Sequence, residues 1–152
     1  MQKVTIRKIE AHDEAAWRKC WAGYCTFYEV ALPQTTTDYT WRRIIDAASP
    51  VHAIIAEDAT HGVIGICNYI IHDNTWEIKP VCYLEDLFVD PALRAGGTGA
   101  AMIEWLKDEM ARAGWSRVYW NTKENNYRAR GLYDKFTPRD PFVRYVIKAP
   151  AA

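Results

Sequence analysis

The sequence predicts an α+β fold, in which a mixed and mainly antiparallel sheet carries helices on both faces. Two apolar runs flank a short turn and predict an antiparallel hairpin. A strand, a glycine-bearing loop, a helix and another strand then follow in order, and such a crossover makes its two strands parallel. No repeat, linker or low-complexity tract interrupts the 152 residues. We therefore expect a single domain over residues 1–152.

The first part of the chain reads as a strand followed by two helices. Apolar and polar residues alternate over 4–9, which is typical of a strand. Asp13 can cap a helix that continues through residues 16–24 at helical spacing. Thr35, followed three residues later by Asp38, resembles a capping box and predicts that a second helix begins there.

Three strands are expected in the middle of the chain. Residues 52–56 and 63–71 are the apolar runs of the hairpin. Residues 81–89 read as a buried strand that is interrupted by two adjacent carboxylates, Glu85 and Asp86. This interruption marks the strand as a candidate site, because buried strands rarely hold neighbouring charges.

The last third of the chain predicts a long helix, two strands and a short helix. Apolar positions recur at helical spacing from Thr98 until Gly114 ends the pattern. Residues 115–122 read as the next strand. A short helix then carries residues 129–133, and the run 142–147 predicts a closing strand.

The charge balance excludes several classes of partner. The chain has 19 lysines and arginines against 19 aspartates and glutamates, so its formal charge is zero. The protein therefore has no overall positive potential that would bind duplex nucleic acid or an anionic membrane. With 49% hydrophobic residues the chain is also too apolar to stay disordered.

The metal-binding and redox residues predict an ordinary reduced protein. The four cysteines form no C-x-x-C pair, and the four histidines lie far apart. We therefore expect free thiols and no metal site. No apolar run reaches the length of a membrane span, and the first residues alternate in polarity rather than forming a signal peptide. We expect a soluble, cytoplasmic protein.

The loop Arg94–Gly99 lies between a predicted buried strand and a helix, where backbone N–H groups and the helix dipole can bind an anion. No Lys-Ser or Lys-Thr follows the glycines, which excludes a triphosphate-binding P-loop. Met102 stands where a dinucleotide fingerprint needs its third glycine. Glu124 can still imitate the ribose-binding acid, so a nucleotide-dependent oxidoreductase remains an alternative.

Two spaced motifs resemble a known family. Arg94, Gly97 and Gly99 form R-x-x-G-x-G at the start of a helix, and Asn126, Ala129 and Tyr133 form N-x-x-A-x-x-x-Y after the next strand. This pattern is similar to the GNAT superfamily of acetyl-CoA-dependent N-acetyltransferases. Tyr-Leu-Glu-Asp-Leu-Phe-Val at residues 83–89 resembles the polyamine and thialysine acetyltransferases, and the chain as a whole resembles the yeast-type histone/polyamine branch.

The resemblance implies a GNAT fold with a six- or seven-stranded sheet and acetyl-CoA as the acyl donor. Its pyrophosphate would lie on the glycine loop, and its pantetheine arm would pair with main-chain groups of a splayed strand. The residues implied as cofactor-binding are Leu87, Phe88, Val89, Arg94, Ala95, Gly96, Gly97, Thr98, Gly99, Ala100, Asn126, Ala129 and Tyr133.

The implied reaction is direct attack of an amine on the thioester, which needs a base and an acid. Glu85 is our candidate base, either through water or with a raised pKa, since an ordinary carboxylate is a weak base for an amine. Tyr133 resembles the residue that protonates the departing thiolate. Adjacent strand residues point to opposite faces unless a bulge intervenes, so only one of Glu85 and Asp86 can readily face the amine. The alternative is that both acids are buried structural anions or dimer contacts.

The expected acceptor is a polyamine, a lysine-like small amine or a basic protein tail. An aromatic and acidic group near the first helix can receive a cation, although such a stripe is more often core. The candidate substrate-binding residues are Tyr24, Phe27, Tyr28, Glu29, Glu85 and Asp86. The resemblance further implies a homodimer. A non-catalytic acyl-CoA-binding module with the same fold is the other alternative.

Overall fold

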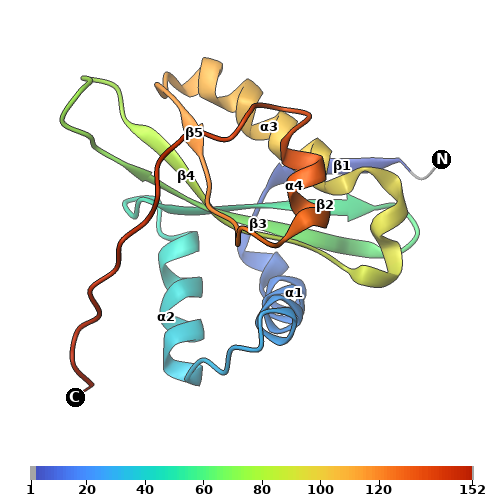
Figure 1. Cartoon of the computed structure of the whole chain (residues 1–152). Helices are drawn as coiled ribbons and strands as arrows, with labels where there is room; N and C mark the ends of the chain where they lie inside the picture. Colours follow the sequence, from blue (N-terminus) through green and yellow to red (C-terminus); the bar gives the residue numbers. More distant parts are fainter. Residues whose placement is uncertain (1–2, 152) are drawn as a thin grey trace. The chain divides into compact units, whose positions relative to one another are not determined.

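The computed structural model describes residues 3–151, and for Arg94 and Ala95 it describes only the backbone. The chain divides into two compact units between Asn121 and Thr122 (Figure 1). The first unit contains the sheet and three long helices, and the second contains one short helix. The single domain expected from the sequence stays a prediction.

The first unit is built on a five-stranded sheet in which the strands follow the chain order. The first four strands pair antiparallel, and the fifth pairs parallel to the fourth. This arrangement confirms the mixed, mainly antiparallel sheet and the crossover. The strands are β1 (Val4–Lys8), β2 (Val51–Asp58), β3 (Gly62–His72), β4 (Val81–Val89) and β5 (Val118–Tyr119).

Three helices cover the sheet. The helices α1 (Glu14–Phe27) and α2 (Gln34–Ile45) lie on one face, and α3 (Thr98–Ala113) lies on the other (Figure 1). Short 3-10 segments, Ala11–Asp13 and Pro91–Gly96, precede α1 and α3. Helices on both faces are therefore confirmed, and α3 begins at Thr98 as its apolar spacing predicts.

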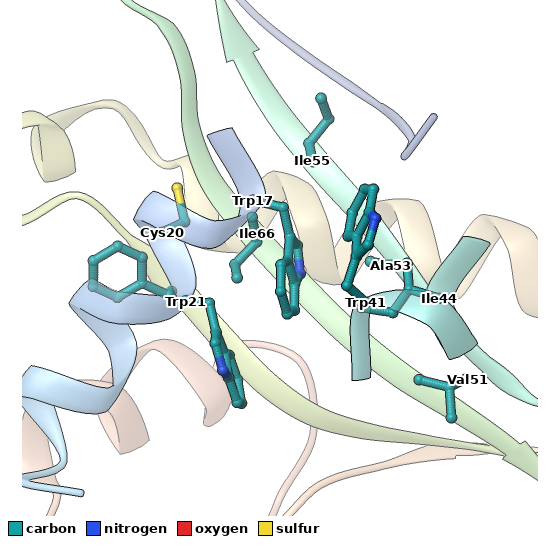
Figure 2. Close-up of a cluster of buried hydrophobic side chains, with 10 residues drawn as sticks. Trp17, Cys20, Trp21, Trp41, Ile44, Val51, Ala53, Ile55 and Ile66 are labelled. Carbon is teal, nitrogen blue, oxygen red and sulfur yellow. The ribbon is translucent and has the colours of Figure 1, made fainter. Parts of the chain in front are cut away.

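A cluster of tryptophans joins α1 and α2 to the sheet (Figure 2). Trp17 is fully buried, and its ring centroid lies 5.6 Å from that of Trp21 and 5.5 Å from that of Trp41. Close packing also sets the distance of α1 from β4, because a Cβ atom on Gly23 would lie only 2.6 Å from the Phe88 ring. The middle of α1 is thus held directly over β4.

The helix starts differ from the predicted caps. Asp13 precedes α1, but its carboxylate binds the Arg7 guanidinium at 2.9 Å instead of capping the helix. The helix α2 begins at Gln34, one residue before the predicted capping box, and Asp38 pairs with Arg18 at 2.8 Å. Asp13 thus stands at the predicted N-cap position without capping through its side chain. The capping box predicted at Thr35 was wrong, because that residue lies inside α2, whose N-cap is Pro33.

The C-terminal strands are fewer than predicted. The strand over 115–122 shrinks to Val118–Tyr119, and residues 142–147 form no strand, so the described chain has five strands rather than six or seven. An apolar run becomes a strand only where another strand offers it a hydrogen-bonded edge. The side chains of Phe142 and Ile147 are instead exposed. In the second unit only α4 (Tyr127–Tyr133) is regular.

Other expectations can be compared with the described residues. All four cysteines are free, as predicted. Within residues 3–151, no helix combines the length and apolar character needed to cross a bilayer. The same residues include no group of three or more metal-ligating side chains.

Candidate functional site

A β-bulge at Glu85 shapes the centre of β4. Asn68 of β3 pairs with Asp86, and the next residue, Tyr69, pairs with Leu84, so Glu85 is the extra residue of β4. A bulge removes the strict alternation of faces that would separate the two neighbouring carboxylates. The Asp86 side chain is buried on the side of the sheet that carries Asn68, whereas Glu85 is exposed. The predicted pair of acids therefore consists of one buried and one accessible group.

Asp86 is held by two neutral hydrogen-bond donors. The Asn68 side-chain amide donates to Oδ2 of Asp86 at 3.1 Å, and the Tyr24 hydroxyl donates to the same carboxylate. Burial raises the pKa of Asp86 above its ordinary value, while these two hydrogen bonds act in the opposite direction. Asp86 is thus a mostly buried carboxylate, and a nearby positive charge would stabilise its ionised form.

The rings of Tyr24 and Tyr28 form an aromatic wall beside the carboxylates. The Tyr24 ring stacks on Trp21 at 5.3 Å and lies 4.7 Å from the Tyr28 ring. Burial and the charge of Asp86, with a smaller contribution from Glu85, raise the pKa of Tyr24, so its hydroxyl stays protonated. Aromatic faces beside carboxylates are a suitable surface for an ammonium group.

The remaining predicted acceptor residues lie at the end of α1. Phe27 is exposed and its ring meets Tyr28 edge-on at 5.1 Å. Glu29 is exposed in a left-handed backbone conformation, with φ of 54°. Among the described contacts none connects Glu29 with Asp86. The structure therefore brings together Tyr24, Tyr28 and the two carboxylates, but leaves Glu29 outside.

A second set of polar side chains lies where β4 pairs with β5. The Tyr83 and Tyr119 rings stack at 4.9 Å, and the Tyr119 hydroxyl lies 2.7 Å from Nε2 of His72. The other ring nitrogen of His72 lies 2.7 Å from the carbonyl of Asp73, so it must donate, and Nε2 accepts from Tyr119. The Asn121 amide donates to the Tyr83 hydroxyl at 3.4 Å.

The edge of β4 becomes open beyond this tyrosine pair. The parallel pairing with β5 involves only Cys82 with Val118 and Tyr83 with Tyr119. Beyond Tyr83, the described part of β5 offers no partner to β4, which continues to Val89. Main-chain groups at Leu87 and Phe88 can therefore bind an extended amide-containing chain on that side. The role predicted for Val89 stays a prediction.

The start of α3 offers a second main-chain site. Gly97 has φ of 71°, and a Cβ atom placed on it would have no neighbour within 4 Å. No side chain among the described residues caps the helix, so the N–H groups of Thr98, Gly99 and Ala100 keep their binding capacity. Gly96 and Gly97 are exposed. This arrangement suits an anionic group such as a pyrophosphate. The predicted role of the Arg94 and Ala95 side chains falls outside what the structure describes.

The second unit contains the remaining predicted residues. Asn126 caps α4, because its side-chain oxygen accepts from the Ala129 N–H at 3.4 Å. Its amide donates to the Thr122 hydroxyl at 3.2 Å. Tyr133 is the last residue of α4. The cofactor-binding role of Asn126 and the acid role of Tyr133 stay predictions, while the helix cap is observed.

Sequence reasoning missed the polar residues that surround the acids. Asn68 and Trp17 come from separate elements, and nothing in their local spacing marks them. Asn68 gave one signal, because it is a polar residue inside a long apolar run. Such a residue, when buried, must find a hydrogen-bond partner on a neighbouring element. Tyr119 and His72 gave no comparable signal.

Comparison with known proteins now identifies the family. Residues 15–137 match the acetyltransferase (GNAT) family. A D-amino-acid N-acetyltransferase of Saccharomyces cerevisiae, HPA3, is 32% identical over 144 residues, which cover 94% of this chain and 89% of the yeast protein. An uncharacterized N-acetyltransferase of Bacillus subtilis, YhfO, is 25% identical, with 97% and 99% of the two chains covered.

Solved structures agree on the fold. A ribosomal-protein-alanine N-acetyltransferase from Brucella melitensis superposes with a TM-score of 0.80 at 18% identity, over 97% of this chain and 99% of the other. The acetyltransferase AAC(6')-Iy, bound to a bisubstrate analogue of CoA, has a TM-score of 0.81 at 20% identity over 97% and 99%. These matches confirm the GNAT fold. The family match, together with the yeast relative, replaces the alternative of a nucleotide-dependent oxidoreductase. The chain belongs to the acetyltransferase (GNAT) family and is an N-acetyltransferase.

Proposed function

We propose that this enzyme transfers the acetyl group of acetyl-CoA to a primary amine. The proposal rests on the structure of β4. Its bulge lies at Glu85, next to Asp86 and the aromatic wall, and β5 pairs with the same strand only as far as Tyr83, before Leu87 and Phe88. One strand thus offers a cation-binding surface and, directly after it, an edge for an amide-containing chain.

The donor-binding residues fit acetyl-CoA. The N–H groups of Thr98, Gly99 and Ala100 suit the pyrophosphate, and Gly96 and Gly97 allow close approach because they lack side chains. The edge of β4 suits the two amides of the pantetheine arm. We further assign Arg94, Ala95, Asn126 and Ala129 to the donor. Acetyl-CoA supplies an acetyl group activated as a thioester.

Two residues would carry out the proton transfers of the reaction. Glu85 accepts a proton from the acceptor ammonium, directly or through water, so that the neutral nitrogen can form the new C–N bond. The C–S bond breaks, and Tyr133 gives its hydroxyl proton to the departing sulfur. A phenol with a pKa of about 10 and a thiol of about 8.5 are close enough to exchange a proton without large tuning.

The acceptor class follows from charge. Two carboxylates and two aromatic rings favour a cationic amine, namely a polyamine, a lysine-like amine or a basic protein tail. The yeast relative is named for D-amino acids, and AAC(6')-Iy was crystallised with an acetylneamine analogue. A D-amino acid is therefore the second candidate. It carries a carboxylate, which Glu85 and Asp86 would repel.

We also propose that the enzyme is a cytoplasmic homodimer. Support for the dimer comes from the exposed apolar side chains of Phe142, Val143, Tyr145, Val146 and Ile147. Such a segment is suited to pairing with another copy of the chain. Light scattering at micromolar concentration tests the proposal, and a mass near 17.5 kDa would contradict it.

The decisive experiment measures release of free thiol from acetyl-CoA. Spermidine, thialysine, histone-tail peptides, aminoglycosides and D-amino acids serve as acceptors, and mass spectrometry of the product identifies the acetylated nitrogen. We expect turnover with the cationic amines. Turnover with D-amino acids alone would replace the cationic acceptor by the second candidate. Absence of turnover, despite binding of acetyl-CoA, would contradict the proposed acceptor classes.

A further inference from the structure

Asp86 is a buried negative charge that lacks a positive partner among the described side chains. Only 9% of its surface is exposed. Its hydrogen-bond donors, the Asn68 amide and the Tyr24 hydroxyl, are both neutral. Of the other buried carboxylates, Asp13 and Glu109 are each paired with an arginine. Asp58 instead accepts from two backbone N–H groups of its turn and lies 3.4 Å from the His61 ring. Burying an uncompensated carboxylate destabilises a protein, so a retained one points to a cation that arrives from outside.

The orientation of Asn68 is fixed by a second residue. The indole N–H of Trp17 donates to Oδ1 of Asn68 at 3.0 Å. An indole nitrogen can only donate, so the amide oxygen of Asn68 must face Trp17. The amide nitrogen must then face Asp86, and its N–H donates to Oδ2. Without Trp17 the amide could rotate and present its oxygen to the carboxylate.

Trp17 is itself held rigidly. It is fully buried between Trp21 and Trp41, and Asn68 is only 3% exposed. The row of side chains from Trp17 through Asn68 to Asp86 therefore has a single arrangement of donors and acceptors. It begins in the tryptophan cluster of Figure 2 and ends at the carboxylate beside the aromatic wall.

We propose that Trp17 and Asn68 are positioning residues, which orient the Asp86 carboxylate to bind the ammonium group of the acceptor. The inference deepens the proposed function and rests on it. In this arrangement Asp86 provides the fixed charge for binding, and proton transfer belongs to Glu85. Tyr24 contributes the second donor to Asp86 and an aromatic face to the acceptor.

The variant Trp17→Phe breaks the first link and keeps an aromatic ring in the core. Trp41→Phe is its matched control, because Trp41 is buried in the same cluster, with its ring centroid 5.5 Å from that of Trp17, but it stands outside the row and outside the aromatic wall. Asn68→Leu removes the donor to Asp86 entirely. Because the carboxylate loses its orientation, this variant should raise KM for the amine by about 10-fold, which corresponds to about 1.4 kcal/mol of binding free energy. The KM for acetyl-CoA should stay unchanged.

The pH profile gives a readout that a packing role would not change. The titratable groups around Asp86 are Tyr24 and Cys25 of α1, Cys67 of β3 and the neighbouring Glu85. The hydrogen bond from Asn68 lowers the pKa of Asp86, so its loss should raise that pKa. The acidic limb of kcat/KM for the amine should then move to higher pH in Asn68→Leu and in Trp17→Phe, but not in Trp41→Phe.

Carbon-13 NMR of the Asp86 carboxyl, recorded on the free protein, separates this inference from the proposed function. We expect its pKa to rise in Asn68→Leu and, by less, in Trp17→Phe. An unchanged Asp86 pKa in a folded Asn68→Leu variant would overturn the inference, whatever the activity. Equal effects of Trp17→Phe and Trp41→Phe on KM would also overturn it. If the wild type acetylates no amine, the proposed function fails, and spermidine binding by calorimetry to wild type and Asn68→Leu still decides whether Asp86 binds a cation.

Discussion

The donor side and the acceptor side of the site are built from different parts of the polypeptide. On the side that we propose for the donor, the main chain would provide the binding groups, namely the N–H groups at the start of α3 and the edge of β4 beyond its pairing with β5. On the acceptor side, side chains from α1, β3 and β4 form a hydrogen-bonded row that ends at Asp86.

This difference has a consequence for specificity. Main-chain groups are the same in every protein, so a donor site made from them needs only glycines and a helix start. An acceptor site made from side chains depends on each residue identity and on the packing that orients it. The substitutions below should therefore separate donor binding, acceptor binding and stability.

The largest effect is expected from Tyr133→Phe. Loss of a general acid lowers kcat by about 10²- to 10⁴-fold, because the departing thiolate must take its proton from water. The KM for acetyl-CoA should change little. Steady-state thiol release measures both constants, and Tyr127→Phe, at an exposed tyrosine of the same helix, is the control. Equal activities of wild type and Tyr133→Phe would remove Tyr133 from the reaction.

A smaller loss of activity is expected from Glu85→Gln. The side chain of Glu85 is exposed, so water can partly replace it as proton acceptor, and kcat should fall by about 10²-fold, at the low end for a general base. The loss should shrink at high pH, where more of the amine is neutral. Glu104→Gln, at another exposed glutamate, controls for surface charge. A constant loss from pH 7 to pH 10 would contradict the role of Glu85 as base.

Gly97→Ala tests the donor side alone. The φ of 71° at Gly97 costs an alanine about 1–2 kcal/mol, and relaxation of that strain would turn the N–H groups away from the pyrophosphate. We expect KM for acetyl-CoA to rise by about 10-fold, as that energy allows. Gly62→Ala introduces the same strain at φ of 73° in the β2–β3 turn. Its stability should fall equally, with KM unchanged, and equal KM values in both variants would refute the assignment of the loop.

The smallest effect on the site is expected from Arg7→Met. Arg7 lowers the pKa of Asp13, so the pair stabilises the fold above the ordinary aspartate pKa, and this stability is lost as the pH falls through the lowered value. Removing Arg7 should decrease the free energy of unfolding at pH 7 by about 1–3 kcal/mol. It should also flatten the dependence of stability on pH below about 4.

Arg18→Met is the control for that variant. Arg18 has nearly the same exposure, 29% against 28% for Arg7, but it pairs with the exposed carboxylates Glu14 and Asp38. Exposed pairs contribute about 0–1 kcal/mol, so its unfolding energy should change less. Urea denaturation of both variants makes the comparison. A smaller loss in Arg7→Met than in Arg18→Met would contradict this account of the Asp13 pair.

Much of the fold could be predicted because its signals are local. The alternation over 4–9, the two runs of the hairpin and the spacing of α3 each depend on residues within one element, and all three match the structure. Asp13 stands at the predicted N-cap position, whereas the capping box predicted at Thr35 was wrong. The carboxylates of Asp13 and Asp38 bind arginines from other elements, which local sequence does not indicate. The strand predicted over 142–147 was wrong because a strand also needs the edge of another strand to pair with, which local sequence does not indicate.

The sequence by itself determined the family and the donor loop. The apolar strand end, the glycines and the helix start follow one another directly in the sequence. A site that binds a ligand through main-chain groups needs no other residues. Tertiary structure alone decided which acid is buried, where the bulge falls, and that Trp17 orients Asn68 toward Asp86. The physical reason is that burial and hydrogen-bond direction depend on neighbours 18 and 51 residues away in the chain, which only folding brings together.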